Sequence, residues 1–285
     1  MKKIVMTPNP YRDKNFKYAH LAETILHEAG IETRICLAFD VDRNFELPSD
    51  VKLYDLRHEL RDADLLICFG GDGTILHASK AATRAGIPIL GVNIGTMGFM
   101  AELESADLKE LRRLANNEYT VEPRMMLHVK VVHDGQTVLE EEALNDAVIT
   151  KGAVARIIQM SVGCDGVEMM SFGGDGVIVA TPTGSTGYSM SAGGPIVEPT
   201  ANNIIITPIC AHDMQSKAVA TSAERVITVE IGRIGRKNAF LSVDGGRAYR
   251  LATGDKITVT RSKYVTKLVH LIDRSFFDII KNKFR

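Results

Sequence analysis

The run Gly70-Gly71-Asp72-Gly73-Thr74 combines residues that can hold a phosphate with one that can move a proton. It follows the apolar run Leu65–Phe69 and opens a segment with helical periodicity, so it is predicted to join a strand to a helix. Glycine lets the backbone approach a phosphate, and the start of a helix offers unpaired N–H groups. Asp72 is therefore a candidate proton acceptor or metal-binding carboxylate. The alternative is a glycine-rich turn in which Asp72 only caps the helix.

A second glycine-rich stretch, residues 93–100, follows the predicted strand Ile87–Val92. Ligands of parallel sheets bind where such loops leave the carboxyl ends of the strands. Two loops on neighbouring strand ends are expected to form facing walls of one cleft. The sequence contains none of the fingerprints of P-loop nucleotidases, dinucleotide-binding dehydrogenases, α/β-hydrolases or zinc proteases.

The first 118 residues alternate short apolar runs with segments of helical spacing, which predicts an α/β domain with a parallel sheet. Strands are expected at residues 31–38, 65–69 and 87–92, and helices near 18–29, 74–85 and from about 106. Gly30 and Gly86 are expected to end the first two helices.

After Pro123 the helical periodicity largely vanishes and a mostly antiparallel β domain is predicted. Asp134-Gly135 is a hairpin dipeptide between the expected strands 127–133 and 137–144. The last segment, from Ser275, has the pattern of a short apolar helix that packs back on a domain. We therefore predict domains at residues 1–120 and 121–272, followed by a C-terminal helix at 273–285 that returns to the first domain.

The composition limits the expected partners. The 285 residues carry a formal net charge of −1, so no global positive field is present to bind nucleic acid or an acidic membrane. Lys2-Lys3 is followed by only three apolar residues, Ile4-Val5-Met6, before polar Thr7, and no 18-residue apolar stretch follows. We expect a cytoplasmic protein whose partners are small molecules or further copies of itself.

Five motifs together resemble those of the NAD kinases. They are GGDGT at 70–74, N-x-G-x-x-G-F at 93–99, Asn145-Asp146, Gly174-Asp175-Gly176 and the hydroxyl-rich run Thr181–Tyr188. The first is shared with lipid kinases and phosphofructokinases. The later motifs are specific, and they follow the order of the family across residues 70–246.

The resemblance implies an α/β N-terminal domain, a β-sandwich C-terminal domain that binds NAD, an active site between them, and a homo-oligomer, either dimer or tetramer. It also implies a reaction in which ATP, bound with Mg²⁺ or another divalent cation, donates its γ-phosphate to the adenosine 2′-hydroxyl of NAD. Asp72 would accept the proton of that hydroxyl. No residue is assigned as a dedicated metal ligand.

In the first domain, the resemblance assigns Gly73 to seat the dinucleotide and Phe99 to pack against its adenine. His77 either reaches a phosphate or is an ordinary histidine on a helix face, and the sequence leaves both open.

In the second domain, Asn145 and Asp146 match the pair that holds ribose hydroxyls, since an amide beside a carboxylate offers both donors and acceptors. Arg156 matches a basic position that contacts phosphate. Asp175 matches a carboxylate that binds the nicotinamide end of NAD. Four further positions match contacts to adenine and ribose: Thr186, Gly187, Tyr188 and Ser191.

Three glycines, Gly173, Gly187 and Gly246, replace larger residues that are usual in the family. The missing side chains at 173 and 246 remove contacts that would tune affinity or donor choice. None of the three changes affects Asp72, so catalysis is expected to survive.

Two other functions are compatible with the GGDGT turn or with the binding loops. A lipid kinase would need a basic or amphipathic surface for membrane attachment, and the sequence shows no clear case of either. A silent dinucleotide sensor has no need of the carboxylate, yet Asp72 is present.

Overall fold

The computed structural model describes residues 1–39, 41, 48, 51–96, 98–152, 157–212, 216–232 and 238–284. The chain divides into two compact units. Unit 1 comprises Met1–Pro123 and Thr266–Arg285, and unit 2 comprises Arg124–Val265. The second unit thus ends at Val265, whereas the sequence suggested a boundary after residue 272.

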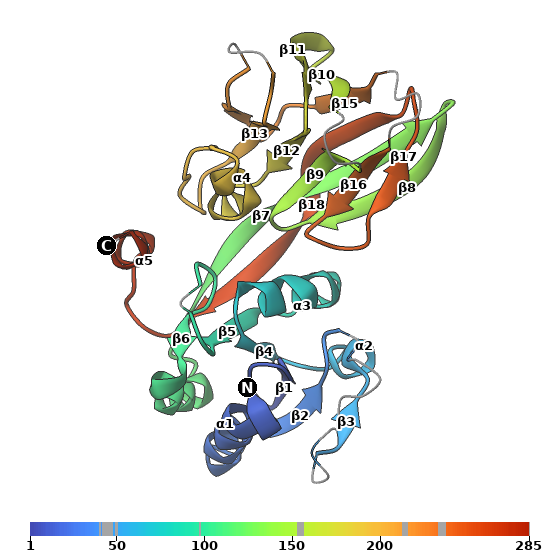
Figure 1. Cartoon of the computed structure of the whole chain (residues 1–285). Coiled ribbons are helices and arrows are strands. Elements are labelled where there is room, and N and C mark those ends of the chain that lie inside the picture. Colours follow the sequence, from blue (N-terminus) through green and yellow to red (C-terminus); the bar gives the residue numbers. More distant parts are fainter. Residues whose placement is uncertain are drawn as a thin grey trace. The chain divides into compact units, whose positions relative to one another are not determined.

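Unit 1 contains a parallel sheet with the strand order β3-β2-β1-β4-β5-β18 (Figure 1). A two-residue strand, β6 (Leu103–Glu104), also pairs with β5. The other bounds are β1 (Lys3–Pro8), β2 (Glu32–Cys36), β3 (Leu53–Tyr54), β4 (Leu65–Gly70), β5 (Ile89–Asn93) and the end of β18 (Lys256–His270).

Helices cover both faces of this sheet because successive strand residues point in opposite directions. Leu90 and Val92 join the core formed with α1 (Lys17–Glu28) and the 3₁₀ helix η2 (Ser105–Asn116). A side chain on Gly91, between them, would meet Ile75 of α3 (Asp72–Ala85), so α3 lies on the other face. The helix expected from about residue 106 is therefore present, but with 3₁₀ geometry. The remaining helices of the unit are η1 (Lys14–Phe16), α2 (Leu56–Glu59) and α5 (Phe276–Lys283).

Unit 2 is a sandwich of two largely antiparallel sheets. One sheet has the order β14-β13-β12-β9-β16-β17, and the other brings together β11, β10, β15, β18, β7 and β8. Alternate residues of both sheets form a single core, with Ile149 and Val177 from the first sheet and Val129 and Val229 from the second. The sequence-based fold class, an α/β domain followed by a β-sandwich-like domain, is confirmed.

The strands of unit 2 are β7 (Thr120–His133), β8 (Gln136–Ala143), β9 (Asp146–Lys151), β10 (Ile158–Cys164), β11 (Val167–Gly174), β12 (Gly176–Ala180), β13 (Asn203–Ile209), β14 (Val219–Ser222), β15 (Ile227–Ile231), β16 (Ala239–Val243) and β17 (Tyr249–Leu251). The hydroxyl-rich run after β12 forms two short helices, η3 (Thr183–Thr186) and α4 (Tyr188–Ser191). β18 is one long strand of 15 residues.

Candidate functional site

Asp72 is the first residue of α3 and lies directly after the turn that ends β4. The turn is tight because Gly70 faces Thr74 and Asn9. A Cβ on Gly70 would approach the Thr74 Cβ to 2.9 Å and the Asn9 Cβ to 3.1 Å. Glycine is thus needed for this close approach, and the predicted strand–turn–helix joint is present.

The Asp72 carboxylate is held by the loop that follows β5. Phe99 N–H donates to Oδ2 at 2.7 Å, and Met100 N–H donates to Oδ1 at 3.0 Å. The helix itself is capped by Gly71, which makes no side-chain capping bond. The capping alternative raised by the sequence is therefore not what the structure shows, because the Asp72 side chain bonds to a different loop.

Gly98 leaves the space that the Asp72 carboxylate occupies. A Cβ on residue 98 would lie 2.5 Å from Asp72 Cγ and nearer still to Oδ1. Any side chain here would displace the carboxylate. The second glycine-rich loop thus fixes Asp72 in position, in addition to forming a wall of the site.

Asp72 lines a pocket of about 430 Å³ in unit 1. It is the one carboxylate among the described residues that line this pocket, and the cations Arg12 and Lys283 line it as well. The remaining lining residues are Asn9, Phe39, Gly71, Gly73, Thr74, His77, Thr96 and Gly98. A single carboxylate beside two cations suits a phosphorylated ligand that must also lose a proton.

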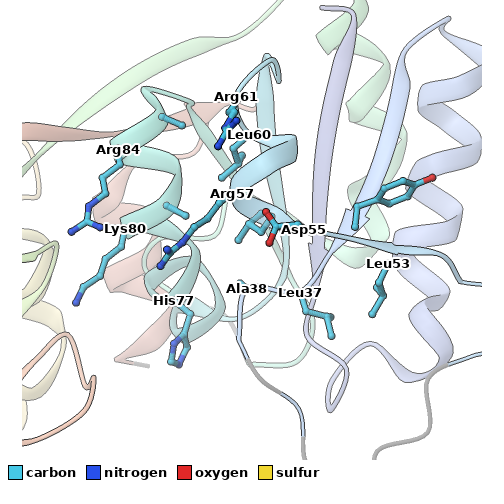
Figure 2. A pocket seen from close by; sticks show the side chains of 14 residues that line it. Leu37, Ala38, Leu53, Asp55, Arg57, Leu60, Arg61, His77, Lys80 and Arg84 are labelled. Atoms are coloured by element: carbon cyan, nitrogen blue, oxygen red, sulfur yellow. The ribbon is translucent and has the colours of Figure 1, made fainter.

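A larger groove of about 820 Å³ adjoins this pocket and shares His77 with it. Figure 2 shows His77, Lys80 and Arg84 along α3, with Arg57 on α2 and Arg61 just after it. The one carboxylate in its lining, Asp55, caps α2 by accepting the His58 N–H at 2.7 Å. The groove offers positive charge but no carboxylate free for proton transfer, so the smaller pocket is the better site for chemistry.

The other predicted residues of unit 1 lie in or beside the pocket. Gly73 is exposed, and no atom within 4 Å would meet a side chain there. The His77 ring lies 5.3 Å from the Phe39 ring, centroid to centroid. The Phe99 ring contacts α5, with its centroid 6.3 Å from that of Phe276.

In unit 2, Asn145 and Asp146 are anchored by the carboxylate of Asp244. Leu144, Asn145 and Asp146 donate their backbone N–H groups to it at 2.7, 2.8 and 3.1 Å. Asp146 is only 6% exposed, and burial, followed by the charge of Asp244, raises its pKa to about 7. This carboxyl can therefore carry or release a proton near neutral pH.

The Asn145-Asp146 pair adjoins the hydroxyl-rich run. Thr181 N–H donates to the carbonyl oxygen of Asn145 at 2.8 Å. A Cβ on Gly187 would lie 3.6 Å from Asn145 Nδ2 and 3.9 Å from Asp146 Oδ2. The Asn145 Oδ1 atom is buried and has no hydrogen-bond partner among the described residues. The structure thus brings Asn145, Asp146 and Gly187 together beside an acceptor that a ligand hydroxyl can satisfy.

Asp175 lies apart from this group. It precedes Gly176 at one end of β12, whereas Asp146 pairs with Ala180 at the other end, five residues away, or roughly 17 Å along a strand. Its carboxylate forms an ion pair with Lys151 at 2.5 Å. Thr186 ends η3, and Tyr188 and Ser191 bound α4, with Tyr188 48% exposed. Arg156 lies outside the described residues.

Two cations of the pocket, Arg12 and Lys283, belong to none of the sequence motifs. Arg12 follows β1, so an inspection of every loop at the carboxyl end of a strand would have found it. Lys283 is at the end of α5, and no local pattern connects it with the GGDGT turn.

No helix in the described part of the chain has both the length and the apolar character needed to cross a bilayer.

Comparison with known proteins identifies relatives of both units. The family model for the ATP-NAD kinase N-terminal domain matches residues 6–119, and that for the ATP-NAD kinase C-terminal domain matches residues 144–271. An NAD kinase of Acetivibrio thermocellus is 37% identical over 99% of this chain and 97% of its own length. One of Ruminiclostridium cellulolyticum is 36% identical over 99% and 98%.

Two solved structures are similar over nearly the whole chain. Yeast NADH kinase complexed with NADH has a TM-score of 0.83 and 26% identity, covering 99% of this chain and 86% of its own. An NAD kinase from Archaeoglobus fulgidus in complex with ATP has a TM-score of 0.75 and 27% identity, covering 99% and 98%.

Proposed function

Since this chain belongs to the ATP-NAD kinase family, we propose that Asp72 is the proton acceptor of its reaction. The enzyme is an ATP-dependent phosphotransferase that converts NAD to NADP by phosphorylating the 2′-hydroxyl of the adenosine ribose. The observation that carries the proposal is the Asp72 carboxylate, fixed by two backbone N–H groups in a pocket that also contains Arg12.

The reaction requires the 2′-oxygen to become a nucleophile. Asp72 takes the hydroxyl proton as the oxygen attacks the γ-phosphorus, the bond to the β-phosphate oxygen breaks, and ADP leaves. The amide bonds from Phe99 and Met100 hold the carboxylate in place for this transfer and use only one acceptor site on each oxygen. Arg12 stabilises negative charge on the phosphoryl oxygens from the same pocket.

The residues present fit a divalent cation that arrives with ATP. Mg²⁺ is usually held by one or two carboxylates together with substrate phosphates. Asp72 provides one carboxylate, and the described residues contain no group of three metal-binding side chains. When bound, the cation neutralises phosphate charge.

For NAD itself, we propose that Asn145 and Asp146 bind ribose hydroxyls. The unpaired Asn145 Oδ1 supports this role, and Gly187 leaves open space beside both side chains. We assign the further contacts that the family pattern suggests to Gly73, His77, Phe99, Arg156, Asp175, Thr186, Tyr188 and Ser191. The enzyme is further proposed to be a cytoplasmic homo-oligomer, dimer or tetramer.

The activity is tested by incubating the protein with NAD, ATP and Mg²⁺ and measuring NADP with an NADP-specific dehydrogenase. Absence of NADP would refute the assigned reaction.

The role of Asp72 is tested with Asp72→Asn, which keeps the shape of the side chain but removes its basicity. We expect kcat to fall about 10²- to 10⁴-fold, the usual contribution of a general base, while NAD binding measured by calorimetry persists. Asp62→Asn is a matched control, since Asp62 is an exposed residue of unit 1 that pairs with Lys3 away from the pocket. A near-normal kcat in Asp72→Asn would exclude Asp72 as the base.

A further inference from the structure

The C-terminal helix α5 is firmly attached within unit 1. Glu102, which is buried, accepts the backbone N–H groups of Leu271 and Ile272 at 2.7 Å each, immediately after β18. Ser275 then caps α5 by accepting the Asp278 N–H at 3.1 Å in a capping box. The helix begins from a fixed point, so the position of its far end is determined by the fold.

Two side chains on one face of α5 contact the Phe99 ring. Phe276 and Lys283 are seven residues apart, or about two helical turns, and so lie on the same face. The Phe276 ring centroid is 6.3 Å from that of Phe99, and Lys283 Nζ is 4.5 Å from the Phe99 centroid. Phe99 in turn donates its backbone N–H to Asp72. The loop that holds the base therefore also positions the end of α5.

This arrangement places the Lys283 ammonium group in the lining of the Asp72 pocket. No carboxylate of the described residues forms an ion pair with it, and its interaction with the Phe99 ring leaves its N–H donors available. Arg12, the other cation in the pocket, already donates to the Ile94 carbonyl at 3.4 Å. Lys281, on the same helix, does not line the pocket.

We propose that Lys283 binds the phosphate chain of ATP, so that the C-terminal helix forms part of the phosphate-donor site. A lysine ammonium is a compact charge with three donors, which suits phosphate oxygens that move during transfer. This inference rests on the NAD kinase activity proposed above. It adds an ATP-binding residue near the C-terminus to a pocket formed mainly by the N-terminal part of the chain.

The test is steady-state kinetics of Lys283→Met, which keeps the length of the side chain but removes its charge, and of Lys283→Arg, which keeps the charge. Lys281→Met is the matched control on the same helix. We expect Lys283→Met to lower kcat/KM for ATP by about 10- to 100-fold, the range for a lost charged hydrogen bond, with KM for NAD unchanged. Lys283→Arg should recover most of the loss, and Lys281→Met should match the wild type.

Three results would overturn the inference. The first is a kcat/KM for ATP in Lys283→Met that equals that of Lys281→Met. The second is a defect confined to KM for NAD. The third is an equal loss of kcat/KM for both substrates with a lower melting temperature, as for a merely structural residue. A wild-type protein that makes no NADP would refute the activity itself, whereas a wild-type rate in Lys283→Met would refute only the role of Lys283.

Discussion

Gly98 lies beside the Asp72 carboxylate, and Gly98→Ala is expected to impair catalysis without disrupting the fold. The new Cβ would lie 2.5 Å from Asp72 Cγ, a separation that must grow beyond 3.0 Å. The Phe99 and Met100 N–H bonds, at 2.7 and 3.0 Å, cannot both survive that shift. Because the φ of Gly98 lies outside the left-handed region, alanine fits its backbone, and the collision with Asp72 is the main effect.

The size of the effect follows from the role of Asp72. Misplacing a reacting group by about 1 Å can cost 10²-fold, and complete loss of a general base costs about 10²- to 10⁴-fold. We expect kcat of Gly98→Ala to fall within this range. Asp72 is half-buried at the edge of an open pocket, so its side chain can move aside and the protein should remain folded.

The assay compares kcat, from coupled NADP formation, with the melting temperature from circular dichroism. Asp62→Asn is again the control, since Asp62 is an exposed residue of unit 1 away from the pocket. In an Asp72→Asn background, Gly98→Ala should cost little more, because both changes remove the same function. A kcat for Gly98→Ala within a few-fold of the wild type would refute this reasoning.

Two further predictions concern stability and pH. The pKa of Asp146 is raised from 3.8 to about 7, so between these pH values the folded state keeps a proton that the unfolded chain has released. The free energy of unfolding therefore falls as pH rises from about 4 to 7. Asp146→Asn should raise the free energy of unfolding by up to about 4 kcal/mol at pH 8 and hardly at pH 4. Urea unfolding at both pH values measures this, and an equal effect at both would contradict it. Burial of Glu102 acts to raise its pKa, but hydrogen bonds from His270 and the backbone lower the pKa overall. The ionised Glu102 therefore stabilises the folded state fully above pH 4.5, and this contribution is lost as pH falls through the lowered pKa. Glu102→Gln should cost about 1.5–3 kcal/mol at pH 7 and less at pH 3, as thermal unfolding would show, and a cost that is independent of pH would argue against this account.

Much of the fold was predictable because its determinants are local. The Asp134-Gly135 turn has φ of 46° and 76°, the left-handed pair that a tight hairpin requires and that this dipeptide favours. Gly86 ends α3 at a φ of 75°, as a glycine after a helix commonly does. The joint that carries Asp72 was equally visible, since an apolar run, glycines and a helical pattern follow one another directly. Such signals depend on neighbouring residues, so the sequence by itself determined the element types and the position of the candidate base.

Tertiary structure alone decided what these residues do together. Asp72 could have capped its own helix, and only the folded chain shows that its carboxylate bonds to Phe99 and Met100 instead. The raised pKa of Asp146 depends on burial and on Asp244, almost a hundred residues along the chain. Lys283 enters the pocket only because β18 and α5 return the chain to unit 1. Contacts between residues remote in sequence leave no local periodicity or spacing. The base could therefore be found from the sequence, whereas the amides that hold it and the cations that line its pocket could be found only from the structure.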